Sequence, residues 1–191
     1  MKSMRDRYFE NFEKIQTPAD NRLGFKTEYR YKGLWYAWDC GESELRREKA
    51  VLLIAEAISA ILYIIAATRR VEFNALRITA GFAVVSIVPF LGELWGVIRF
   101  TFIKQPMMVM DFNEIRDCIQ IGTVVRVILL AAAVLTGLFT LIFQGHMSLP
   151  DALTILAHVL TAGVSVFIFL RYRKLNFRIL RNVSGKAGPE V

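Results

Sequence analysis

Residues 119–143 read IQIGTVVRVILLAAAVLTGLFTLIF, a run of 25 residues with one charged side chain, Arg126. At about 1.5 Å of helix per residue, such a run crosses the roughly 30 Å hydrocarbon layer of a bilayer. Similar runs occur at residues 51–68, 78–98 and 149–170, and the four runs together make up 86 of the 191 residues. A soluble chain of this length could not bury four such helices on all sides. The sequence therefore predicts a multi-pass integral membrane protein.

We expect an all-α fold, a four-helix transmembrane bundle over residues 49–170. A short aromatic-rich region at residues 1–48 precedes the bundle, and a basic tail at residues 171–191 follows it. With 54% hydrophobic residues and a mean hydropathy of +0.40, the composition excludes a soluble enzyme, a disulfide-stapled secreted module and a disordered tail protein.

The N-terminal region contains two patterns. Hydrophobic residues recur at helical spacing near its start, which predicts a short amphipathic helix containing Met4, Tyr8, Phe9, Phe12 and Ile15. In residues 26–39, KTEYRYKGLWYAWD, aromatic and charged residues alternate, which predicts a partly extended segment. This segment is typical of an aromatic belt at the membrane surface, and a partner-binding β-hairpin is the alternative.

The distribution of basic residues predicts the orientation. If both termini and the connection between the second and third spans lie on one side, that side carries 20 Lys and Arg residues and the other carries three. Cytoplasmic segments collect Lys and Arg, so we expect both termini in the cytoplasm and the protein in the plasma membrane. Arg69, Arg70 and Arg77 are the three that oppose this orientation.

Local signals predict where helices begin and end. Glu42 and Arg46 are spaced to pair at the start of the first helix, and Pro150 suits the first turn of the fourth. The Asp111-x-x-Glu114 pattern predicts a capping box that opens the third helix. After residue 170 the helix is expected to continue to residue 182, with basic residues that contact anionic headgroups.

Each predicted span carries an ionisable residue inside the hydrocarbon layer: Glu56, Glu93, Arg126 and His158. Charges inside the hydrocarbon layer are costly, so such residues face the bundle interior and pair. Counted from the nearest charged residue at the cytoplasmic end, the first three lie roughly 9–13 Å deep. We therefore expect a Glu56–Arg126–Glu93 cluster, with His158 beyond the midplane.

Two further sequence features concern the bundle interior, a polar stripe and a helix kink. The fourth span places its polar residues on one helical face, a stripe formed by Thr154, His158, Thr161 and Ser165. In the second span, Pro89 cannot donate a backbone hydrogen bond, which predicts a kink one turn before Gly92 and Glu93.

The cluster has two interpretations. In the structural one, Arg126 pairs with one or both glutamates and fixes helix register, with one carboxyl carrying a proton. In the functional one, the second carboxyl takes up and releases a proton or cation during transport of a small solute.

Catalytic parts are missing from the sequence: it has two histidines, and no nucleophile elbow, phosphate-binding loop or acidic metal cluster. We expect no enzyme activity, no cofactor and no metal. Haem ligation by His158 and Cu(I) binding by Met107, Met108 and Met110 near Cys118 are weaker alternatives. The net charge of +7 reflects attraction to anionic lipid rather than to nucleic acid.

The leading hypothesis is a non-catalytic membrane component that forms a homo-oligomer or docks a protein partner through its cytoplasmic face. The alternative is a small proton- or cation-coupled transporter or channel that uses the Glu56, Glu93, Arg126 and His158 side chains.

Overall fold

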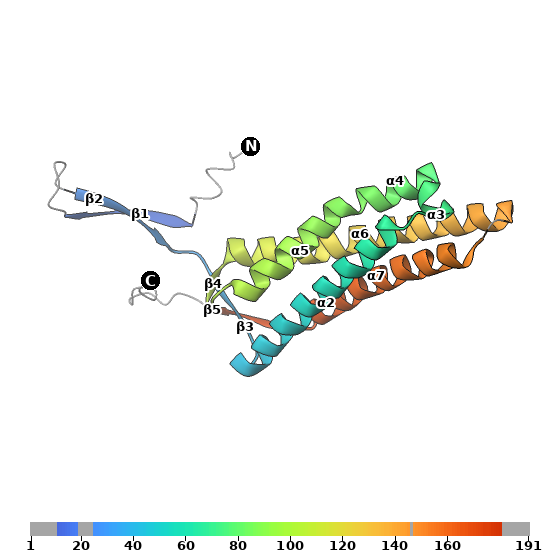
Figure 1. Cartoon of the computed structure of the whole chain (residues 1–191). Coiled ribbons are helices and arrows are strands. Elements are labelled where there is room, and N and C mark those ends of the chain that lie inside the picture. The colour runs from blue at the N-terminus through green and yellow to red at the C-terminus, as the bar shows by residue number, and fades with distance from the viewer. Residues whose placement is uncertain (1–10, 19–24, 146, 181–191) are drawn as a thin grey trace.

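The computed structural model describes residues 11–18, 25–145 and 147–180. It is mostly helical, and four helical segments are long and apolar enough to cross a membrane: 42–68, 77–102, 109–144 and 149–173. They are formed by α2 (Glu42–Thr68), by α4 (Arg77–Val85) with α5 (Ile87–Phe102), by α6 (Val109–Gln144) and by α7 (Leu149–Arg173). The helices run side by side in an elongated bundle (Figure 1), as the hydropathy predicts.

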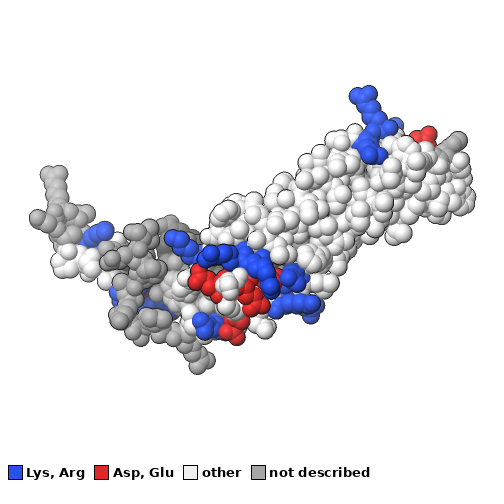
Figure 2. Space-filling model, turned by 60° about the horizontal axis from the view of Figure 1, so that its bottom comes forward, with Lys and Arg blue, Asp and Glu red and all other residues white. Residues whose placement is uncertain are grey.

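The bundle is apolar outside, and its polar side chains within the membrane-spanning part are buried inside, beside an apolar core. Its most exposed hydrophobic side chains belong to the helices, and they include Ile54, Ile61, Val88, Leu91, Ile128, Leu135 and Phe139. The fully or almost fully buried polar side chains include Ser59, Thr79, Ser86, Thr123, Thr154, Thr161 and Ser165. In Figure 2, Lys, Arg, Asp and Glu gather at the two ends of the bundle and leave its middle white. This inverted arrangement suits a hydrocarbon surrounding.

A three-stranded sheet closes one end of the bundle, which we call the strand end. Its order is β4 (Met107–Met108), β3 (Trp35–Trp38) and β5 (Phe177–Leu180), and all neighbours are antiparallel. Trp38 is 3% exposed and packs edge-on against Phe100 and Tyr172. The sheet thus joins the segment before α2, the α5–α6 connection and the segment after α7, which places all three at one end.

A separate hairpin projects from the strand end. It consists of β1 (Phe12–Pro18) and β2 (Phe25–Tyr31), paired antiparallel from Phe12 opposite Tyr31 to Pro18 opposite Phe25. In Figure 1 the hairpin extends away from the helices. The Tyr31 hydroxyl links its base to the bundle by accepting a hydrogen bond from the Val109 backbone N–H.

The opposite end, which we call the far end, is closed by the short helix α3 (Glu72–Ala75) and the α6–α7 connection. Ser148 and Asp151 form a capping box at the start of α7, and an Asp151 carboxylate oxygen also accepts the Phe73 backbone N–H at 2.9 Å. Phe73 is fully buried and lies against Gly137, where any side chain would collide with its ring.

The all-α prediction is wrong for the segments that flank the bundle. Phe12 and Ile15 lie in β1 and not in an amphipathic helix, while Met4, Tyr8 and Phe9 lie outside the described residues. The helix expected to continue to residue 182 ends at Arg173, and β5 follows. Short amphipathic segments fit either periodicity, and here pairing of β1 with β2 and of β5 with β3 decides for strand.

The predicted cap of the third helix is also wrong. The helix begins at Val109, two residues before Asp111, and its N-cap Met108 makes no side-chain cap. Asp111 and Glu114 do not form a capping box, because both bind Arg99 of α5. Hydropathy marks the part of a helix that suits lipid and not its full length. The Glu42–Arg46 pair and the position of Pro150 in the first turn of α7 are confirmed.

Candidate functional site

Three helices place their ionisable side chains in one buried layer. Glu56 comes from α2, Glu93 from α5 and Arg126 from α6, and each is fully buried. Each lies on the inward side of its helix, because the remaining sides carry the aliphatic residues that cover the bundle. The structure thus brings together the three residues that the sequence places at a similar depth in the membrane.

Arg126 is bound most closely to Glu93. Its Nη1 atom lies 3.1 Å from a Glu93 carboxylate oxygen and donates to the Ser165 hydroxyl oxygen at 3.2 Å. The Ser165 hydroxyl donates in turn to the same Glu93 oxygen, also at 3.2 Å. The guanidinium lies over the Phe90 ring, 4.3 Å from its centre. The three polar groups form a closed triangle in which charge and hydrogen bonding support each other.

Glu56 is held more loosely. Its nearest oxygen is 3.9 Å from Nη1 of Arg126, and neither oxygen has an N–H or O–H donor among the described residues. Its carboxyl group also faces that of Glu93. Two acids and one base therefore occupy the same buried layer, and with both acids ionised the layer has a net charge of −1.

The predicted polar stripe lies inside the bundle. Thr154, His158, Thr161 and Ser165 are all fully buried on the inward face of α7. The threonine hydroxyls donate to backbone carbonyls one turn earlier in the helix. The His158 ring lies between Phe73 and Tyr63, with centre distances of 5.6 and 6.0 Å, and neither nitrogen has a partner in the described part of the chain.

The interruption in the second span lies at Ser86, one turn before Pro89. The Ala83 carbonyl accepts the hydroxyls of Tyr63 and Ser86, each at 2.6 Å, so side chains compensate for the broken helix. A side chain at Gly92 would have no neighbour within 4 Å of its Cβ atom, so this glycine does not serve close packing.

Besides Gly137, close packing occurs at Gly96 and Gly122. A side chain at Gly96 would meet Ile119, and one at Gly122 would meet the backbone of Pro89 and Glu93. Gly122 was missed in the sequence, although a small residue four positions before Arg126 is the available signal.

Polar links at the strand end were also missed. Glu48 forms a two-point ion pair with Arg171, Lys49 donates to the Ile103 carbonyl, and Arg99 binds both Asp111 and Glu114. These links join α2 to α7, α2 to the end of α5, and α5 to α6. Their signal was the presence of opposite charges just outside each apolar run.

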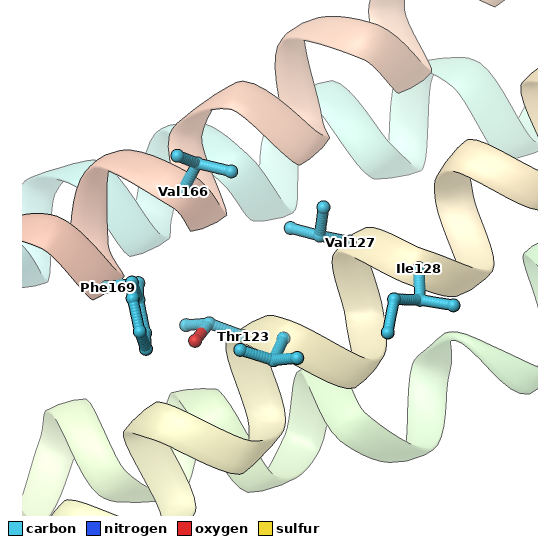
Figure 3. Close-up of a pocket in the computed structure, with 6 residues that line it drawn as sticks. Thr123, Val127, Ile128, Val166 and Phe169 are labelled. Carbon is cyan, nitrogen blue, oxygen red and sulfur yellow. The ribbon is translucent and has the colours of Figure 1, made fainter.

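A groove between α6 and α7 is separate from the acid–base layer. Its volume is about 140 Å³, and Figure 3 shows aliphatic and aromatic side chains along both walls. Its lining residues are Thr123, Val124, Val127, Ile128, Val166 and Phe169. Since none of the charged residues contributes to it, the groove offers an apolar surface and no route to the cluster.

Fold and site together define a helical bundle of membrane-protein type with an acid–base layer in its core. Comparison of the chain with protein-family models, curated proteins and solved structures finds no match. Its function must therefore be inferred from the residues themselves.

Proposed function

We propose that the protein is a non-catalytic, multi-span membrane component that docks a protein partner at its strand end. The observation that carries this proposal is the β1–β2 hairpin, a two-stranded sheet that projects beyond the helices (Figure 1). A two-stranded sheet in water gains little stability by itself, and a strand edge is a template on which another chain can pair.

The hairpin's surface supports a protein partner. Residues directly opposite each other share a face, so Phe12, Tyr31 and Tyr29 lie on one side of the sheet. Tyr29 is 56% exposed. Aromatic side chains are enriched at the centre of protein interfaces, and Lys14, opposite Tyr29 on the same face, adds a basic group beside them.

The bundle behind the hairpin supports a scaffold role. The sheet β4–β3–β5 and the three polar links tie together the ends of all four spans. A platform with this many cross-links holds the hairpin in a fixed place, which lowers the entropy cost of docking.

Native mass spectrometry of the full chain from mild detergent tests docking. We expect a homo-oligomer or a co-purifying protein, which the double variant Tyr29→Ser, Arg30→Glu loses. The matched control is Arg46→Glu, an exposed charge reversal on α2 at the same end. Wild-type monomers without any bound protein would contradict the proposal, and so would equal loss in the control.

For orientation we propose that the strand end faces the cytoplasm, near anionic headgroups of the plasma membrane, because most basic residues belong to it. A cysteine at the exposed position Gly41, in a chain with Cys40 and Cys118 replaced by serine, tests this. We expect an impermeant thiol reagent to label it in inside-out vesicles and not in right-side-out vesicles.

Proton- or cation-coupled transport is the second candidate function, and the excess acid in the core supports it. In that case Glu56, Glu93, Arg126 and His158 are the working groups. A pH-driven flux into proteoliposomes that Glu93→Gln abolishes, with folding retained, is the expected result. Absence of flux under every gradient would contradict it and leave the docking proposal intact.

A further inference from the structure

The kind of side chain buried inside the bundle, apolar or polar, changes along its axis. Between the acid–base layer and the strand end lies an apolar layer to which each span contributes one fully buried side chain: Leu52, Val97, Ile119 and Ile168. Phe100 and Ile115, also fully buried, extend this layer toward the sheet. This apolar layer, the strand-end seal, separates the acid–base layer from the strand end, where the Trp38 indole nitrogen and the Tyr172 hydroxyl are also buried without a partner among the described residues.

On the other side of the acid–base layer the interior is polar. Ser59 lies one turn beyond Glu56 on α2, and Thr161 and His158 follow on α7, all fully buried. The Ser59 hydroxyl and both His158 nitrogens have no hydrogen-bond partner among the described residues. Buried polar atoms of this kind are ordinarily hydrogen-bonded by internal water. From Ser165 to His158 is roughly 10 Å along the helix, which a short relay of hydroxyl groups and water spans.

At the far end this polar column is closed by Phe73 and a small apolar cluster around it. Phe73 is fully buried, its ring centre lies 5.6 Å from that of His158, and its backbone N–H is held by Asp151. The apolar cluster around it is small and includes Leu141 and Ile155. The far-end closure is therefore thinner than the strand-end seal.

The composition of the acid–base layer selects its ligand. Glu56 is faced by Glu93 from α5 and Arg126 from α6, and His158 and Tyr63 are the nearest other titratable groups, on α7 and α2. In the described part of the chain no group of three His, Cys, Asp or Glu could hold a metal ion. Arg126 already supplies a cation and repels a second one. A proton needs no coordination shell, and it converts one carboxylate to a carboxylic acid, which brings the layer from −1 to neutral.

We propose that the Glu56–Glu93 pair is a site for one proton, exchanged with the aqueous side at the far end through Ser59, Thr161 and His158. Phe73 is the gate of this path. The proton site does not depend on docking, and proton uptake can occur without solute flux. A negative result in the docking, flux or infrared experiment therefore leaves the other two proposals standing.

Infrared difference spectroscopy of the full chain in lipid, between low and high pH, tests the site. We expect a carbonyl band of a buried carboxylic acid in the wild type. Glu56→Gln and Glu93→Gln should each abolish it, because the one remaining carboxylate is then neutralised by Arg126. The matched control, Glu114→Gln at the strand end, should keep the band. A band unchanged in both core variants would overturn the proposal.

The rate of hydrogen–deuterium exchange of that band tests the direction of the path. In detergent both ends of the bundle face water, so only the internal barriers differ. We expect Phe73→Ala to accelerate exchange severalfold and Leu52→Ala, an equally buried truncation in the strand-end seal, to leave it unchanged. Equal acceleration in both variants, or acceleration in Leu52→Ala alone, would overturn the proposed path.

Discussion

At the strand end a three-stranded sheet, three polar links and an aromatic core close the bundle, whereas at the far end the closure consists of the Asp151 bonds, two Asn74 hydrogen bonds and a small apolar cluster around Phe73. Many independent contacts make the strand end tolerant of single changes and suitable as a fixed platform. The far end depends on few side chains and adjoins a polar interior. We infer that the two ends have different roles, docking at one and proton access at the other.

The largest effect is expected in the layer between the two ends. Arg126→Leu leaves two buried carboxyl groups without their cation, which we expect to destabilise the fold by roughly 3–5 kcal/mol. The measurement is the yield of monodisperse protein and its thermal unfolding in detergent.

Adding Glu56→Gln and Glu93→Gln to Arg126→Leu should restore much of the lost stability, because a neutral core can replace a buried ion pair. If the triple variant is no more stable than Arg126→Leu, then Arg126 does not stabilise the fold by balancing the charges of Glu56 and Glu93.

A smaller but still clear effect is expected at the far end. Asp151→Ala removes the carboxylate half of the α7 capping box and the acceptor of the Phe73 N–H, at a cost of roughly 1.5–3 kcal/mol. Hydrogen exchange in residues 71–76 should increase while exchange in β3 stays slow. The control is Glu72→Gln, an exposed neighbour. An increase at both ends would show that they are not independent.

At the strand end a single deletion should matter less. Glu48→Gln weakens the ion pair with Arg171, whose side chain is 36% exposed. We therefore expect the free energy of unfolding to fall by about 1 kcal/mol or less. Thermal unfolding at low and high salt measures this loss, since salt should reduce the difference in unfolding temperature between the variant and the wild type. A loss as large as that of Asp151→Ala would contradict the distributed closure of this end.

The smallest effect concerns the hairpin base. Burial raises the pKa of Tyr31 above its usual 10.0, so its ionisation is easier in the unfolded chain. The stability it contributes is complete below about pH 10 and is lost as the pH rises through the higher folded value. The phenolate still accepts the Val109 N–H, so the pH effect is measured by thermal unfolding: above about pH 10 the unfolding temperature should fall more in the wild type than in Tyr31→Phe. Exchange of the Val109 amide reports the hydrogen bond itself. In Tyr31→Phe this exchange should be fast already at neutral pH, because the amide lacks its acceptor.

Sequence reasoning located the core more accurately than the ends. Glu56, Glu93 and Arg126 could be grouped because helical rise converts residue counts to depth. The Ser148-x-x-Asp151 capping box was present in the sequence and was overlooked. The contact of Phe73 with His158, 85 positions apart in the chain, has no local signal, since it depends on how α3 turns over the end of α7.

By itself the sequence determined four apolar helices and the polar face of each, because hydropathy and a 3.6-residue period are properties of local segments. Tertiary structure alone decided that Arg126 binds Glu93 more closely than Glu56, that α6 begins at Val109, and that residues 177–180 form a strand. These outcomes depend on distances of a few ångströms between segments distant in the chain, and on the β3 edge that becomes available only when the bundle has formed.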